Sequence, residues 1–61
     1  MIISDLTAVY DGEIIISLND EDETPIYSGD ADRVPLNLMD DGVRNIYPNV
    51  GYIHVILYRN R

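Results

Sequence analysis

The sequence predicts an α+β domain, in which one short N-terminal helix accompanies a four-stranded, mostly antiparallel twisted sheet or partly open barrel. Apolar residues recur at helical spacing near the start of the chain, and later stretches alternate between apolar and polar side chains. Turn-forming residues divide those stretches into two hairpins. Because the chain has 61 residues, we expect a single domain over residues 1–61 with a small core.

The first expected element is a helix of about two turns. Ser4 is the expected N-cap, and Asp5 follows it near the positive end of the helix dipole. Asp11-Gly12 supplies the stop signal. The apolar contacts at helical spacing would come from Leu6, Val9 and Tyr10, with Ile2 or Ile3 as a hydrophobic staple.

The first hairpin is expected from strands at residues 13–18 and 25–28. Ile14, Ile16 and Leu18 share one face of the first strand, and three consecutive isoleucines favour extended structure. A polar connector at residues 19–24 links the strands. Pro25 belongs at a strand start or on an edge, because it has no N–H for the ladder.

The second hairpin follows a single helical turn expected at residues 34–39, with Pro35 as its first residue. Its strands are expected at residues 43–47, ended by Pro48, and at residues 52–58. In the last strand Ile53, Val55 and Leu57 alternate with Tyr52, His54, Ile56 and Tyr58. The helix would cover one face of the sheet, and barrel closure or a second chain would cover the other.

The charge is unevenly distributed along the chain. Residues 1–32 carry nine acidic residues and no basic residue, whereas residues 33–61 carry four arginines and two aspartates, which leaves a net charge of −7. This asymmetry is consistent with a negative surface that steers a basic partner, or with charge that only keeps the protein soluble. A chain without lysine is a poor candidate for binding nucleic acid or anionic lipid directly.

Catalysis and metal binding have little support in the residue inventory. The chain has no cysteine, and His54 is its only histidine. The residues Asp20-x-Asp22-x-Thr24 have the spacing of a calcium loop, but Pro25 stands where glycine is needed and Ala31 where glutamate is needed. We therefore expect no enzyme, no cofactor and no metal site.

The sequence also predicts neither a membrane span nor an export signal. The longest apolar run is Ile14-Ile15-Ile16, and the first five residues include no basic residue. A cytoplasmic protein is the expectation.

Two surfaces are candidates for a protein partner. Carboxylates on turns can imitate DNA phosphates and occupy a cationic groove. These carboxylates belong to Asp20, Glu21, Asp22, Glu23, Asp30, Asp32, Asp40 and Asp41. The second candidate is a patch on the last strand, formed by Tyr52, His54, Ile56 and Tyr58, which suits a partner or a homodimer if it is not part of the core.

The order of segments resembles that of short acidic proteins encoded by phages and other mobile elements of Gram-positive bacteria. The matching residues are Ile3-Ser4-Asp5-Leu6, the strand at 13–18 with its acidic turn, Ile26-Tyr27-Ser28-Gly29, Val34-Pro35, Leu38-Met39-Asp40, Val43 and Ile46-Tyr47-Pro48. In size and charge the chain is similar to anti-CRISPR proteins, some of which act as DNA mimics against Cas9.

That resemblance implies a phage protein that inhibits Cas9 or another defence nuclease in the host cytoplasm. The acidic residues named above would then contact the arginines that normally hold DNA. The alternative is a non-catalytic interaction module that self-associates through an apolar sheet face.

Overall fold

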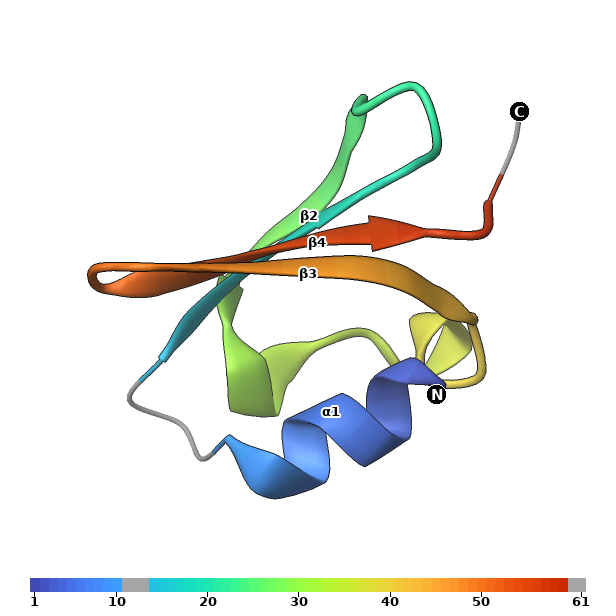
Figure 1. Cartoon of the computed structure of the whole chain (residues 1–61). Coiled ribbons are helices and arrows are strands. Elements are labelled where there is room, and N and C mark those ends of the chain that lie inside the picture. The colour runs from blue at the N-terminus through green and yellow to red at the C-terminus, as the bar shows by residue number, and fades with distance from the viewer. Residues whose placement is uncertain (11–13, 60–61) are drawn as a thin grey trace.

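The fold is one open sheet above a layer of short helical segments (Figure 1). The structure is a computed structural model, and it describes residues 1–10 and 14–59. Its elements are α1 (Ile3–Val9), β1 (Ile15–Asn19), β2 (Pro25–Asp30), the 3₁₀ turns η1 (Ala31–Arg33) and η2 (Leu36–Leu38), β3 (Val43–Asn49) and β4 (Tyr52–Leu57). The predicted α+β class with a twisted four-stranded sheet is confirmed, and the sheet does not close into a barrel.

The sheet is mixed and has the strand order β2-β1-β4-β3. β1 pairs antiparallel with β2, and β3 pairs antiparallel with β4, as the two predicted hairpins require. The hairpins join through β1 and β4, which run parallel with Ser17 opposite His54. Residues 31–42 make this possible, because they carry the chain beneath the sheet from β2 at one edge to β3 at the other (Figure 1).

The core lies between the sheet and the helical layer. The inward faces of the two central strands supply Ile16, Leu18, Ile53, Val55 and Leu57, all of which are buried. The helical layer contributes Ile3, Leu6, Ala31, Val34 and Leu38. Full burial of a side chain of this kind stabilises the fold by about 1.5–3 kcal/mol, so these contacts hold helical segments that are too short to form alone.

The start of α1 differs from the prediction. Its N-cap is Ile2, so Ser4 lies inside the first turn and is not the cap. The Ile2 N–H donates to Asp5 Oδ2 at 3.0 Å, and the Ser4 N–H donates to the Met39 carbonyl at 2.9 Å. The free amides of the first turn are therefore bonded by a neighbouring segment, which makes a side-chain cap unnecessary. The predicted stop at Asp11-Gly12 lies outside the described residues.

Several element bounds also differ. β2 continues to Asp30, which pairs with Ile15, and η1 was not predicted. The single helical turn is present as η2, but Pro35 precedes it as the N-cap. Pro48 lies within β3 and does not end it, because β3 is an edge strand where a missing N–H is tolerated.

Candidate functional site

The turn between β1 and β2 is organised around the carboxylate of Asp20. Asp20 is 1% exposed, and its Oδ1 accepts hydrogen bonds from the Asp22 and Thr24 backbone amides, each at 2.9 Å. Backbone bonds from Asp20 N to Thr24 O and from Glu23 N to Asp20 O, at 3.0 and 2.9 Å, close the turn. Asp20 thus shapes the turn from inside and does not offer a carboxylate to a partner, in contrast to its prediction as a partner contact.

The three following carboxylates are carried on the outside of this turn. Asp22 and Glu23 are exposed, and Glu21 is partly exposed. The Glu21 N–H donates to the Arg59 carbonyl at 3.1 Å, which ties the turn to the segment after β4. Glu23 has φ 62, a left-handed backbone conformation that costs a non-glycine residue about 1–2 kcal/mol. We name Glu21, Asp22 and Glu23 the acidic turn.

The remaining predicted acidic residues lie elsewhere. Asp30 ends β2 at the opposite end of the hairpin, where its Oδ2 is 3.6 Å from Arg33 Nε, and exposed Asp32 follows in η1 beneath the sheet (Figure 1). Asp41 Oδ2 is 3.1 Å from Arg59 Nε, and Asp40 is exposed beside it. The eight predicted residues therefore do not form one continuous surface.

The predicted patch on the last strand is also divided. Tyr52 and His54 lie on the sheet face turned away from the helical layer, which we call the open face, and Tyr52 is 42% exposed. Ile56 shares this face but is only 5% exposed. Tyr58 is exposed but follows the end of β4, and its N–H donates to the Gly42 carbonyl. Ile56 is thus a buried contact, and Tyr58 does not continue the strand face.

A polar network that sequence reasoning missed is centred on Asn19. The buried Asn19 amide lies 3.1 Å from the Ser17 carbonyl, 3.3 Å from Ser17 Oγ and the Val55 carbonyl, and 3.4 Å from His54 Nδ1. The other ring nitrogen of His54, Nε2, lies 3.6 Å from Glu23 Oε1, so the ring stands between the Asn19 amide and the Glu23 carboxylate. A nucleophile–base pair of Ser17 and His54 would need a direct contact between the serine hydroxyl and the histidine ring. The Asn19 amide lies between these two groups.

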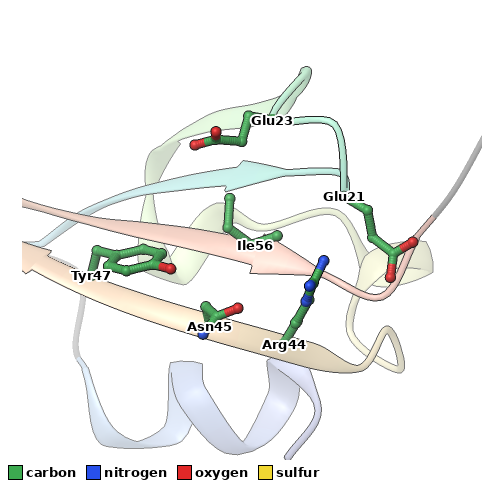
Figure 2. Close-up of a pocket in the computed structure, with 6 residues that line it drawn as sticks. All are labelled: Glu21, Glu23, Arg44, Asn45, Tyr47 and Ile56. Atoms are coloured by element: carbon green, nitrogen blue, oxygen red, sulfur yellow. The ribbon is translucent and has the colours of Figure 1, made fainter.

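A pocket on the open face joins the acidic turn to β3. Its volume is about 210 Å³, and Figure 2 shows its lining residues, which are Glu21, Glu23, Arg44, Asn45, Tyr47 and Ile56. A register shift between Val43 and Asn45 in β3 accompanies this site. In a regular strand Arg44 and Asn45 would face opposite sides, so the shift lets both line one pocket.

Within residues 1–10 and 14–59, no three histidine, cysteine, aspartate or glutamate side chains are grouped so that they could hold an ion. In the turn that has the spacing of a calcium loop, Asp20 Oδ1 accepts two backbone amides.

Comparisons with known proteins returned no match to a family model, a curated protein or a solved structure. Among the described residues, no helix has the length and apolar character that a membrane span requires.

Proposed function

We propose that this protein is a non-catalytic, acidic inhibitor that binds the basic nucleic-acid groove of a defence nuclease, with Cas9 as the first target to test. The observation that carries the proposal is the acidic turn. Three consecutive carboxylates project from a turn whose backbone is fixed by Asp20 and by the Arg59 carbonyl. A fixed turn loses little conformational entropy on binding, so its charges are available for contacts with a partner.

The charge balance around this turn supports the proposal. Among the described residues, ion pairs join arginine to Asp30 and Asp41, and none joins arginine to the acidic turn. The turn therefore carries three consecutive carboxylates, of which Glu23 lies 3.6 Å from the His54 ring and none is paired with a described arginine. Carboxylates in this state can replace phosphates opposite the arginines of a DNA channel, where bidentate pairs are favoured.

A DNA-cleavage assay with Cas9 tests the proposal. The protein is added to the guide-loaded nuclease before the target DNA, at two salt concentrations. We expect inhibition that weakens as salt rises, because the attraction between exposed charges is screened. If Cas9 cuts DNA equally well with and without the protein, Cas9 is not the target.

Two double variants, each of which removes two negative charges, show which carboxylates contact the nuclease. Asp22→Asn with Glu23→Gln removes two of the three charges of the acidic turn, and Asp32→Asn with Asp40→Asn removes two charges from exposed carboxylates elsewhere. We expect the first pair to weaken inhibition about tenfold in low salt and the second to change it by less than about twofold. Equal losses for both pairs would show that net charge alone, and not the acidic turn, causes the effect.

Self-association through the open face is the second candidate function. Ile15, Tyr47 and Tyr52 are 38%, 51% and 42% exposed, and they come from the three adjacent strands β1, β3 and β4. Large exposed apolar side chains in one region are typical of interaction surfaces. Light scattering should then show a dimer that Tyr52→Glu dissociates, and a monomer at high protein concentration would contradict this function.

A further inference from the structure

The pocket on the open face is assembled from parts of the chain that are distant in sequence. Its floor is Ile56 on β4, which is 5% exposed although no helix of the described chain covers this face. One wall comes from the turn between β1 and β2, and the other comes from β3 at the edge of the sheet (Figure 2). The parallel pairing of β1 with β4 is what brings these two walls opposite each other.

The two walls differ in their chemistry. The turn supplies the carboxylates of Glu21 and Glu23, and β3 supplies the Tyr47 ring and the Asn45 amide (Figure 2). Among the described lining residues Arg44 is the single cation, so the lining holds two carboxylates and one guanidinium. The lining has an excess of negative charge above an apolar floor, which favours a cation that also has an apolar part.

This combination of groups suits a guanidinium better than a metal ion or an ammonium group. A metal ion is disfavoured, because the described residues hold no cluster of three ligands. A lysine ammonium is a compact and strongly hydrated charge, whereas a guanidinium is planar, weakly hydrated and able to stack on an aromatic ring. Tyr47 offers such a ring, and two carboxylates with one amide oxygen offer several acceptors for its five N–H groups.

We propose that this pocket receives an arginine side chain of the partner protein, an inference that rests on the function proposed above and specifies its central contact. The guanidinium lies between Glu21 and Glu23 and stacks on Tyr47, and the aliphatic part of the side chain packs on Ile56. A basic DNA-binding groove carries arginines of this kind.

Arg44 competes with the incoming arginine. It is exposed, and its guanidinium extends from β3 toward the side of the pocket that carries Glu21 (Figure 2). The incoming cation must displace it or bind beside it. Removal of this charge should therefore strengthen binding, which is the opposite of the effect expected from removal of Glu21 or Glu23.

A tripeptide probe tests the pocket without knowledge of the partner. Acetyl-Gly-Arg-Gly-amide is titrated into the isotopically labelled full chain and followed by NMR, with lysine and citrulline versions as controls. We expect millimolar binding of the arginine peptide with shifts at Glu21, Asn45, Tyr47 and Ile56, weaker binding of the lysine peptide, and no binding of uncharged citrulline. Equal affinities for arginine and lysine, or equal shifts at Asp32 and Asp40, would overturn the proposal.

Four variants sharpen the test. Tyr47→Leu should weaken binding of the arginine peptide about two- to fivefold, and Tyr47→Phe should retain it, because the ring is what stacks on the guanidinium. Arg44→Gln should tighten binding about two- to fivefold. Arg33→Gln removes an equal charge at the far end of β2 and should have no effect. If Arg44→Gln and Arg33→Gln give the same affinity, Arg44 does not compete with the incoming arginine for the pocket.

The outcomes separate this inference from the proposed function. Peptide binding that follows the expected pattern, together with no inhibition of any nuclease, supports the pocket and contradicts the inhibitor function. Inhibition that depends on Asp22 and Glu23 but is unchanged by Tyr47→Leu supports the inhibitor and contradicts the arginine pocket.

Discussion

Asp20 and Asp22 stand two positions apart in one acidic run, and the fold uses them in different ways. The Asp20 side chain is buried and accepts two backbone hydrogen bonds, whereas the Asp22 side chain is exposed. At the scale of single residues, a carboxylate that accepts hydrogen bonds within its own turn holds that turn, and one that accepts none is available to a partner. Residue type alone does not reveal this.

Asp20→Ala should lower the free energy of unfolding by about 2–3 kcal/mol, because two backbone amides lose their acceptor. Asp22→Ala, the matched change two residues later, should alter it by less than about 0.5 kcal/mol. Urea unfolding of both variants measures the difference. If the two variants are equally stable, the Asp20 bonds do not hold the turn.

Glu23 has an unusual backbone conformation. Its φ of 62 is unfavourable for a side chain with a Cβ, and glycine removes that penalty. Glu23→Gly should therefore leave the protein as stable as the wild type or more stable by up to about 1 kcal/mol, while it weakens binding to the partner. Thermal unfolding and the cleavage assay together test this trade-off, and a loss of both stability and binding would refute it.

At the scale of elements, α1 depends on packing more than on its own sequence. It has seven residues, of which Ile3 and Leu6 are buried in the core. Leu6→Ala should cost about 2–4 kcal/mol, a large part of the stability of so small a domain. Val9 is 75% exposed on the same helix, so Val9→Ala should be nearly neutral. Chemical denaturation of the two variants decides whether this helix is held by its buried face.

The elements could be predicted from sequence to different degrees. Alternation of Ile53, Val55 and Leu57 with the other residues of the strand predicted β4 but not which of its faces is buried, and both hairpins follow from local turn signals. The cap of α1 could not be predicted, because the amides of its first turn bond to the distant Met39 carbonyl. The extension of β3 through Pro48 likewise depends on its place at the sheet edge, which only the strand order shows.

At the scale of the whole molecule, the candidate site could be predicted only in part, because it too depends on contacts between distant parts of the chain. The run of acidic residues is visible in the sequence and predicted the acidic turn. Arg44, Asn45 and Tyr47 were missed, because they reach this turn only through the parallel pairing of β1 with β4 and a register shift in β3. Apolar and polar alternation fixes which face a side chain takes within a strand, but it does not fix which strands are neighbours.

The central claim is that the acidic turn occupies the groove in which the partner holds nucleic acid. The most direct test measures the affinity of the protein for guide-loaded Cas9 in the presence of increasing amounts of a target DNA duplex. If the claim holds, the apparent dissociation constant rises with DNA concentration, because both ligands compete for one groove. An affinity that stays constant as DNA saturates the nuclease would place the protein elsewhere on its partner and contradict the claim.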